Sequence, residues 1–300
     1  MATVYQAKKA AVQLLAEDQL AAGQTPKDLK FAINYLSFFG YIGLQLLNDL
    51  SLDDLKDAAK QFQKWFGLKQ DGFVGPKTIR AMQGPRCGCP DVLDEEKKEH
   101  VEFLQMQELV EEKRDKWSKK ALTYAIDGYV TGLSKQVQAA MIEAAFCSWE
   151  AHVDIEIVRC SRNKSKTADI LVGVGSGKKH NFDGQGGTLA WAYLPQNDKQ
   201  LRMRFDLAET WVKKPFERGI HFQTVAAHEI GHLLGLQHSK QSGALMAPYY
   251  NPFVGKPQAK DDIPRIQKMY GPSGLPASIT DPPEKVVELS PGESVLIRSR

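Results

Sequence analysis

The chain has 300 residues, of which 42% are hydrophobic and 25% charged, and its formal net charge is +3 at pH 7. This is the composition of an ordinary globular protein, and the length suits two modest domains or one domain with a long extension. The small net charge gives no indication of a nucleic-acid partner, and no apolar run approaches the roughly 18 residues that a membrane span requires. We therefore expect a monomer with neither a membrane span nor a nucleic-acid partner.

The N-terminus does not have the pattern of a secretory leader. Its one apolar stretch is short and runs into Glu17 and Asp18, where a leader would continue with apolar residues. We expect no signal peptide in this sequence.

Residues 1–84 are predicted to form a small helical domain. Apolar side chains recur at helical spacing at Leu55, Ala58, Phe62 and Phe66. The following stretch QDGFVGPKT supplies two glycines and a proline, which indicate turns. About three helices ending near Met82 are expected.

A charged segment separates this domain from the rest of the chain. Residues 92–116 contain the runs DEEKKEH and EEKRDK, which are typical of an exposed linker or a solvated helix. Exposed polar connections are also the favoured sites of proteolytic cutting.

Strands and helices alternate from Trp117 onward. The strand-like segments are LTYAI, DIEIV, DILVGVG and TLAWAYL, and helical patterns cover residues 134–150 and 221–234. This order predicts one mixed sheet with helices. The residues after Gly271 begin as a Pro/Gly-rich linker, and 272–300 are expected to be a linker and tail.

The four cysteines do not make a disulfide-dense scaffold. Cys87 and Cys89 are too close in sequence for an easy mutual bridge. A bridge between Cys147 and Cys160 stays open, since their spacing alone does not decide it.

Two histidines one helical turn apart are the most informative feature. His228 and His232 enclose Glu229 in an HExxH pattern. Residues i and i+4 share one face of a helix, so both imidazoles can reach one ion, and neutral imidazole is a good zinc ligand. Glu229, beside the first ligand, can accept a proton from metal-bound water.

The residues that follow favour a shared metal. Gly235 can end the helix in a left-handed conformation, so that the returning chain brings in His238. Three protein ligands leave the fourth position of a tetrahedral zinc ion open, as catalysis requires. The alternative, three unrelated surface or core histidines, is disfavoured because all three fall between residues 228 and 238.

The pattern resembles the metzincin motif HExxHxxGxxH, which a Met-turn follows. Met246, eight residues after His238, matches that turn. The segments ALMAPYY and DDIPRIQKMYG resemble those of the matrixins, the matrix metalloproteinase family. The resemblance implies an α+β metzincin-like catalytic domain over residues 117–271, with a mixed, mostly parallel sheet and helices.

The N-terminal half resembles the same family. The segment PRCGCPD at residues 85–91 is similar to the matrixin cysteine switch PRCGxPD, with Cys89 in place of the usual apolar residue. The helices before it resemble an all-α, peptidoglycan-binding-like prodomain. The resemblance assigns the fourth zinc position of the latent state to Cys87, with Arg86 and Asp91 paired to hold the segment. A thiolate is a strong zinc ligand and would keep an activated water out.

Residues 182–189, FDGQGGTL, resemble the matrixin calcium loop. Glycines let backbone carbonyls converge on a hard cation, and carboxylates complete its oxygen shell. The alternative is a plain glycine-rich turn. The resemblance implies calcium ligands in the side chains of Asp183, Asp206 and Glu209 and in the carbonyls of Gly184, Gly186 and Thr188.

Matrixins also hold a structural zinc bound by three histidines and an aspartate. The matching positions here are Ser176, Lys178, Trp191 and Arg204, none of which is a usual zinc ligand. We therefore expect one catalytic zinc and at least one calcium, with the second zinc absent.

These features predict a zinc-dependent endopeptidase made as a latent zymogen. Glu229 would pass the proton of the attacking water to the leaving amine. The resemblance further implies substrate contacts at the carbonyl of Ala190, at Thr224 in the pocket, and at the wall from Pro248 to Tyr250.

The same resemblance implies partners and a location. Protein substrates of the extracellular-matrix type, an activating protease that cuts between the switch and Trp117, and a place outside the cell are expected. The alternative function is a cell-wall or peptidoglycan-binding protein, or a wall-targeted metallohydrolase, since the helical domain resembles such modules. A catalytically dead regulator is disfavoured because every catalytic position is present.

Overall fold

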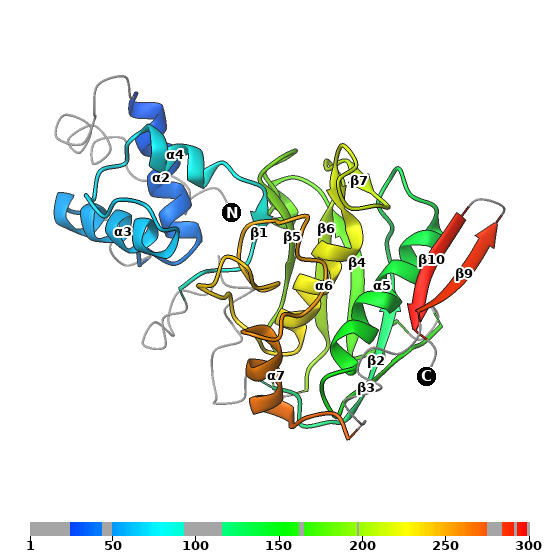
Figure 1. The fold of residues 1–300 in the computed structure, drawn as a ribbon. Helices are drawn as coiled ribbons and strands as arrows, with labels where there is room; N and C mark the ends of the chain where they lie inside the picture. The colour runs from blue at the N-terminus through cyan, green and yellow to red at the C-terminus, as the bar shows by residue number, and fades with distance from the viewer. Residues whose placement is uncertain are drawn as a thin grey trace. The chain divides into compact units, whose positions relative to one another are not determined.

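The computed structural model describes residues 25–43, 50–92, 116–161, 165–196 and 198–274, together with the backbone of 284–290 and 293–298. The chain divides into two units, one with residues 1–84 and 89–111 and the other with residues 85–88 and 112–300 (Figure 1). The N-terminal segment expected to lack a leader, and the charged linker between residues 93 and 115, lie outside the described residues.

The described part of the first unit is helical, as predicted. Its helices share one apolar core to which Ile33, Leu55, Phe62 and Met82 contribute. The helices are α2 (Pro26–Phe38), α3 (Leu52–Trp65) and α4 (Pro76–Met82).

Helices α2 and α3 begin at reciprocal side-chain caps. In α2 the Thr25 side chain accepts from the Asp28 N–H, while the Asp28 carboxylate accepts from the Thr25 N–H; Ser51 and Asp54 do the same for α3. These pairs satisfy backbone donors that a helix start would otherwise leave open.

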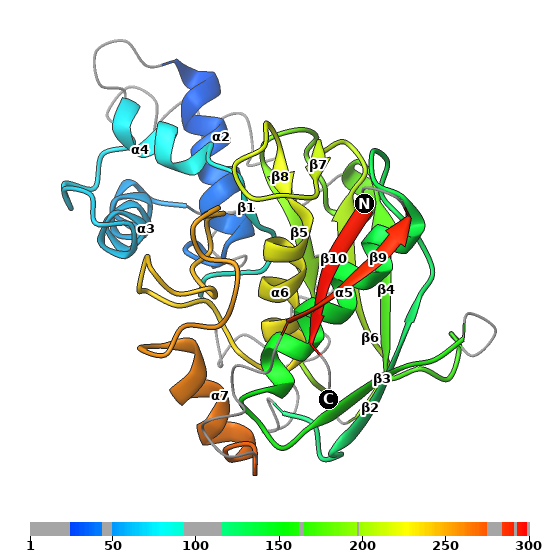
Figure 2. The ribbon, with the colours of Figure 1, turned by 45° about the vertical axis from the view of Figure 1, so that its right-hand side comes forward.

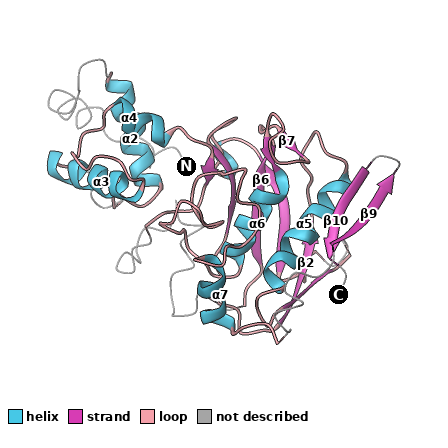
Figure 3. Ribbon diagram, in the orientation of Figure 1, coloured by secondary structure: helices cyan, strands magenta, loops and turns pink. Residues whose placement is uncertain are grey.

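The second unit is built on a six-stranded sheet, drawn in magenta in Figure 3, and its strands have the order β1-β5-β6-β4-β2-β3 (Figure 1). Only the β5–β6 pair of this sheet is antiparallel, which confirms the mixed, mostly parallel arrangement. The strands are β1 (Arg86–Cys87), β2 (Ala121–Ile126), β3 (Glu156–Arg159), β4 (Ile170–Gly175), β5 (Thr188–Ala192) and β6 (Leu201–Asp206).

Two long helices, α5 (Lys135–Glu150) and α6 (Phe222–Leu233), lie side by side over one face of this sheet (Figures 1 and 2). The indole N–H of Trp149 on α5 donates to the carbonyl of Ala227 on α6 at 2.8 Å. The Trp117 indole donates to the carbonyl of Leu233, the last residue of α6, also at 2.8 Å. The helix that carries HExxH is thus held by tryptophan contacts at its middle and at its end.

Shorter elements complete the unit. Strands β7 (Trp211–Val212) and β8 (Ile220–His221) form a parallel pair just before α6, and η3 (Lys178–His180) is a 3-10 turn. Helix α7 (Asp262–Tyr270) contacts the C-terminal end of α6, where the Tyr270 hydroxyl donates to the Leu234 carbonyl at 2.8 Å.

The segment expected to be a linker and tail contains a hairpin. Strands β9 (Glu284–Ser290) and β10 (Glu293–Arg298) pair antiparallel, and β10 lies against α5 (Figure 2). Within the described residues, no helix has both the length and the apolar character to cross a membrane. Cys147 and Cys160 are thiols and do not form a disulfide.

Candidate metal centre and substrate cleft

Helix α6 presents its two histidines to the same side and then stops abruptly. Gly235 has φ +100°, which confirms the expected left-handed turn. The Leu236 N–H donates to the Gly231 carbonyl at 2.9 Å and the Gly235 N–H to the His232 carbonyl at 2.8 Å. This pair of bonds is a Schellman motif, which satisfies the last carbonyls of the helix and turns the chain back toward His238.

The glycine inside the motif makes room for the Met-turn. A Cβ atom on Gly231 would lie 2.2 Å from Sδ of Met246 and 2.9 Å from a ring carbon of Trp149. Met246 is fully buried. Only a residue without a side chain lets Met246 pack this closely under α6, beneath the two histidines.

The three histidine rings converge. Their centroids lie 5.0 Å apart for His228 and His232, 5.4 Å for His228 and His238, and 4.8 Å for His232 and His238. Nδ1 of His228 lies 2.7 Å from the Leu245 carbonyl, and Nδ1 of His232 lies 2.7 Å from the Leu236 carbonyl. Because a carbonyl can only accept, Nδ1 carries the proton in both rings, and Nε2 is left with the lone pair that a metal needs.

A fourth donor atom comes from strand β1, which belongs to the same unit as the histidines. Sγ of Cys87 lies 3.5 Å from Nε2 of His232. One ligand atom from each of Cys87, His228, His232 and His238 lies within 4.8 Å of the others, and all four residues are buried.

This donor set fits zinc. Usual zinc–sulfur and zinc–nitrogen bond lengths at a tetrahedral angle put the two ligand atoms about 3.6 Å apart, close to the distance observed between Cys87 and His232. Burial and the neighbouring histidines lower the pKa of His232 well below its usual value, so its ring is a neutral ligand at pH 7. Three imidazoles and a thiolate form one of the standard zinc-binding sets.

Glu229 lies beside these ligands and is completely buried. Burial raises the pKa of its carboxyl to about 8, although the nearby Cys87 thiol opposes the shift. A cation held by the histidines would lower this pKa and favour the carboxylate, which is the form that accepts a proton.

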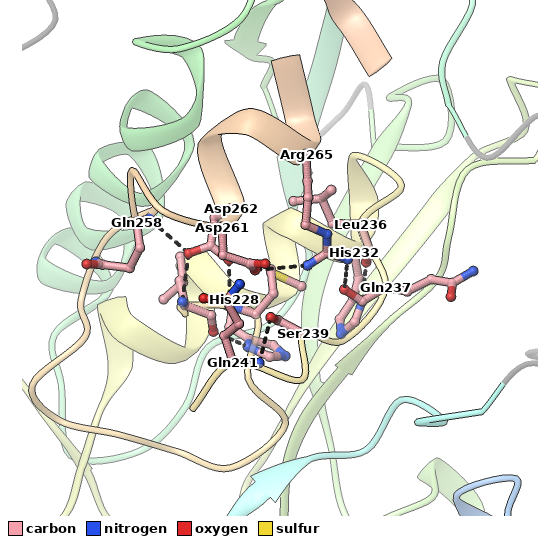
Figure 4. Close-up of polar contacts among 12 residues, drawn as sticks. His228, His232, Leu236, Gln237, Ser239, Gln241, Gln258, Asp261, Asp262 and Arg265 are labelled. Atoms are coloured by element: carbon pink, nitrogen blue, oxygen red, sulfur yellow. Dashed lines mark hydrogen bonds and ion pairs between the residues drawn. The ribbon is translucent and has the colours of Figure 1, made fainter. Parts of the chain in front are cut away.

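A second carboxylate holds the Met-turn in place. Asp262, fully buried at the start of α7, accepts from the backbone N–H groups of Leu245 at 2.7 Å, Met246 at 3.1 Å and Gln258 at 2.8 Å. Figure 4 shows this residue beside His228. Because the Leu245 carbonyl accepts from Nδ1 of His228, Asp262 fixes the position of His228 through the backbone of Leu245.

The neighbouring acid ties the loop after α6 to α7. Asp261 pairs with Arg265 at 3.2 Å, and the Arg265 guanidinium also donates to the Gln237 carbonyl at 2.7 Å, next to His238 (Figure 4). The loop that presents the third histidine is therefore fixed from the α7 side. The family resemblance offered Asp261 or Asp262 as a partner for the new N-terminus of an activated chain, whereas Arg265 had no predicted role.

The segment that carries Cys87 lies as an extra strand in a cleft. On one side, β1 pairs parallel with β5, and the Gly88 N–H donates to the Ala190 carbonyl at 2.8 Å. On the other side, the Cys87 N–H donates to the Pro248 carbonyl at 2.9 Å and the Tyr250 N–H to the Pro85 carbonyl at 3.0 Å. The edge of β5 and the Pro248–Tyr250 wall can thus both bind an extended backbone between them.

A pocket that is open to solvent lies next to Cys87 and His228. Glu229, Thr224, Pro248 and Tyr250 all line it, whereas Ala190 lies on β5 outside its lining. Oγ1 of Thr224 lies 2.8 Å from Nδ1 of the buried His221. The side of the pocket that Thr224 forms is therefore backed by a hydrogen bond between two side chains, which the sequence did not predict.

Arg86 and Asp91, the two residues expected to hold the switch, each make contacts that the sequence did not predict. Arg86 is buried, donates from Nε to the Cys87 carbonyl at 3.0 Å, and lies over the Tyr249 ring. Asp91 belongs to the first unit, where it accepts from the Tyr41 hydroxyl at 2.8 Å. The pairing of Arg86 with Asp91 stays a prediction.

Carboxylates gather around the glycine-rich loop. Oδ1 of Asp183 accepts from the Thr188 N–H at 2.8 Å, and Oε1 of Glu209 accepts from the Gly186 N–H at 2.6 Å. Burial raises the pKa of both Asp206 and Glu209, and the charge of Asp183 raises it further. A divalent cation would relieve this repulsion, so the residues fit calcium. The positive φ angles of Gly184 and Gly186 shape the loop.

Other contacts occupy three of the four positions that match the structural zinc. The Trp191 indole donates to the His180 carbonyl at 2.8 Å, and the Ser176 carbonyl lies 3.0 Å from Nδ1 of His180. Arg204 forms an ion pair with Asp127 at 3.1 Å, and its side chain is only 11% exposed. Lys178 lies in the η3 turn.

An HExxH helix, a third histidine after a glycine turn, and a Met-turn below them, on a mixed sheet, define a metalloendopeptidase domain. Comparison with known families matches residues 116–271 to the matrixin family and residues 25–82 to a peptidoglycan binding domain. The chain belongs to the matrixin family.

Similar proteins agree with this assignment. The chain is 37% identical to interstitial collagenase of Sus scrofa over 227 residues, which cover 74% of this chain and 44% of the collagenase. It is 34% identical to matrilysin of Rattus norvegicus over 72% of this chain and 76% of matrilysin. It is 32% identical to macrophage metalloelastase of Rattus norvegicus over 90% of this chain and 57% of that protein. The chain thus spans about half the length of several of these relatives.

Proposed function

We propose that this protein is a zinc-dependent endopeptidase that is kept latent by its own Cys87. The observation that carries the proposal is the buried group of three histidines and one cysteine whose ligand atoms lie within 4.8 Å of one another. His228, His232 and His238 would hold the ion, and Cys87 would occupy the position that a water needs for catalysis.

Zinc bound by these histidines would supply a Lewis acid that polarises the scissile carbonyl and lowers the pKa of a water. Glu229 would accept the proton of that water and transfer it to the leaving amine. Its burial supports this role, because desolvation raises the pKa of a carboxyl group and makes its carboxylate a stronger base than an exposed one. While Cys87 remains in the cleft, Glu229 has no water to act on.

The substrate would bind as an added strand. The Ala190 carbonyl and the Pro248 carbonyl, which now accept from Gly88 and Cys87, can accept equally from a peptide after the switch segment leaves. The side chain after the cut bond would enter the pocket bordered by Thr224 and Tyr250. Removal of residues 85–88 by an activating protease would therefore open both the metal and the cleft.

The relatives support a class of substrate and a location. Because they include a collagenase and a metalloelastase, we propose matrix-type proteins as substrates and a site of action outside the cell. At least one calcium ion would bind at the Asp183, Asp206 and Glu209 loop, and no second zinc would bind at Arg204 and its neighbours.

The test combines metal content with activity. Glu229→Ala should lower kcat on a generic peptide by roughly 10²–10⁴-fold after thiol activation, while about one zinc per chain is retained. Glu143→Ala is the matched control, because Glu143 is an exposed acid on α5 and should leave kcat unchanged. An active Glu229→Ala variant, or a wild-type chain without zinc, would end the proposal.

A further inference from the structure

Two exposed phenylalanines contact each other beside the cleft. Phe216 is 66% exposed and Phe253 is 80% exposed, the highest values among the exposed large hydrophobic residues that the structure describes. Their ring centroids lie 4.9 Å apart. The two residues come from different loops, so a paired aromatic surface is formed although each ring remains mostly in water. Exposed aromatic clusters of this kind mark binding surfaces more often than scattered apolar residues do.

The backbone at Phe216 is held in an unfavourable conformation. Its φ of +69° lies in the left-handed region, which a bulky residue rarely adopts. The other described non-glycine residues with positive φ are Asn181 and Asp198, types that tolerate this region. Strain that the surrounding fold imposes is a common feature of binding sites.

The aromatic pair is continuous with the pocket wall. The Phe253 N–H donates to the Asn251 side chain at 3.0 Å, and Asn251 and Val254 on either side of it both line the pocket. The loop of Phe216 leads directly into β8, where the His221 N–H donates to the Tyr250 hydroxyl at 3.0 Å. A peptide that fills the pocket and continues along this wall therefore passes close to Phe216 and Phe253.

The border of the pair is mainly cationic. Lys214 and Arg218 flank Phe216 and are exposed, and Lys256 follows Phe253 and is also exposed; Glu217 is the one acid among these four neighbours. Charges at the rim of an interface select partners of the opposite sign. An apolar centre with a positive border fits an aromatic or large aliphatic side chain that has carboxylates near it in sequence.

We propose that Phe216 and Phe253 form a second substrate subsite, separate from the pocket next to the zinc ligands. It takes an aromatic or large aliphatic side chain a few residues after the cut bond, in an acidic stretch of the cleaved protein. The subsite lies on the side of the residues after the cut bond, because it adjoins the wall from Pro248 to Tyr250. In the proposed function, this wall borders the pocket for the first residue after the cut. This inference rests on the proposed endopeptidase function.

The test uses the full chain after activation by a thiol-reactive mercurial. One peptide series carries Phe at the second, third, fourth or fifth position after the cut, next to Glu, and a matched series carries Ser there. The wild type should prefer the best Phe peptide by about tenfold in kcat/KM, mainly through KM. F216A/F253A should lose this preference and cleave the Ser peptides as fast as the wild type does. Leu207→Ala and Val158→Ala, exposed apolar residues on other surfaces, are the controls.

A binding measurement separates this inference from the protease assignment. Fluorescence anisotropy with a labelled, non-hydrolysable Phe peptide should show about tenfold weaker binding to F216A/F253A. Equal binding by the variant and the wild type, or an unchanged Phe preference, would refute the subsite even if cleavage is observed. If no peptide is cleaved but binding still depends on the two rings, the endopeptidase proposal fails and the subsite stands. Phe253→Ala alone serves if changes at Phe216 disturb its strained loop.

Discussion

Sγ of Cys87 lies 3.5 Å from Nε2 of His232, although the two residues are 145 positions apart in the sequence. The contact forms because the Cys87 segment pairs with β5 on one side and with the Pro248–Tyr250 wall on the other. The backbone groups that would bind a substrate are the same ones that hold the Cys87 sulfur next to His232. On the proposed function, latency and substrate binding would compete for one cleft.

Cys87→Ser should release latency. A hydroxyl is a much poorer zinc ligand than a thiolate, so water can enter the fourth position. We expect the basal peptidase activity of the intact chain to rise by at least about tenfold, which corresponds to about 1.4 kcal/mol. A mercurial should then give no further increase. Cys147→Ser, a cysteine on α5, should leave basal activity unchanged; a latent Cys87→Ser variant would disprove the switch.

Asp262→Ala should destabilise the catalytic unit and loosen its zinc. The change leaves the buried N–H groups of Leu245 and Met246, and the half-buried N–H of Gln258, without their acceptor. Each unsatisfied buried group is costly, so the loss should be about 3 kcal/mol or more in denaturant unfolding followed by tryptophan fluorescence. Asp261→Ala is the control, since it removes only the ion pair with Arg265. Equal stability losses in both variants would argue against a special role for Asp262.

Calcium removal should lower the melting temperature of the catalytic unit. Burial and the charge of Asp183 raise the pKa values of Asp206 and Glu209, which shows that the carboxylates repel one another. Adding calcium at about 100-fold above its dissociation constant should raise the melting temperature by roughly 5 °C or more over a calcium-chelated sample with zinc held saturating. Asp206→Asn should weaken this response, and Glu143→Gln should not. If calcium leaves the melting temperature unchanged, residues 182–189 form a plain glycine-rich turn and not a calcium-binding loop.

Asp169 should make stability depend on pH. Burial raises the pKa of its carboxyl, but hydrogen bonds from Lys119 and Thr123 outweigh burial and lower it overall. A lowered pKa in the folded state means that the ionised form stabilises the fold. This stabilisation is complete above the unfolded pKa near 4 and is lost as the pH falls through the lower folded value.

Asp169→Asn therefore lowers the melting temperature at pH 7 by about 2–4 °C, the shift that about 1 kcal/mol gives in a domain of this size. The difference from the wild type should shrink as the pH is taken below about 4. Asp154→Asn provides the comparison, because its ion pair with Lys120 is exposed and should contribute little. If the difference in melting temperature between Asp169→Asn and the wild type stays constant from pH 7 to pH 3, the ionisation of Asp169 does not contribute to stability as proposed.

The tail shows where local patterns were not enough. Residues 272–300 were predicted to be a linker and tail, yet their backbone contains the β9–β10 hairpin. The runs KVVEL and SVLIR with Pro291 and Gly292 between them are a hairpin signal, but the linker-like residues before them dominated the interpretation. A two-stranded hairpin depends on what it packs against, here α5, and that neighbour is distant in sequence.

The sequence alone determined the chemistry that depends on short spacings. His228, Glu229 and His232 share a helix face because four residues make about one turn, and Gly235 ends that helix because only glycine adopts its φ readily. Tertiary structure decided the contacts between distant segments: Asp262 with the backbone of the Met-turn, Phe216 against Phe253, and the strand pairing that brings Cys87 to His232. The resemblance of PRCGCPD to a cysteine switch predicted Cys87 near the histidines, but no local pattern encodes the other two contacts, because each is fixed by how the helices and loops pack against one another.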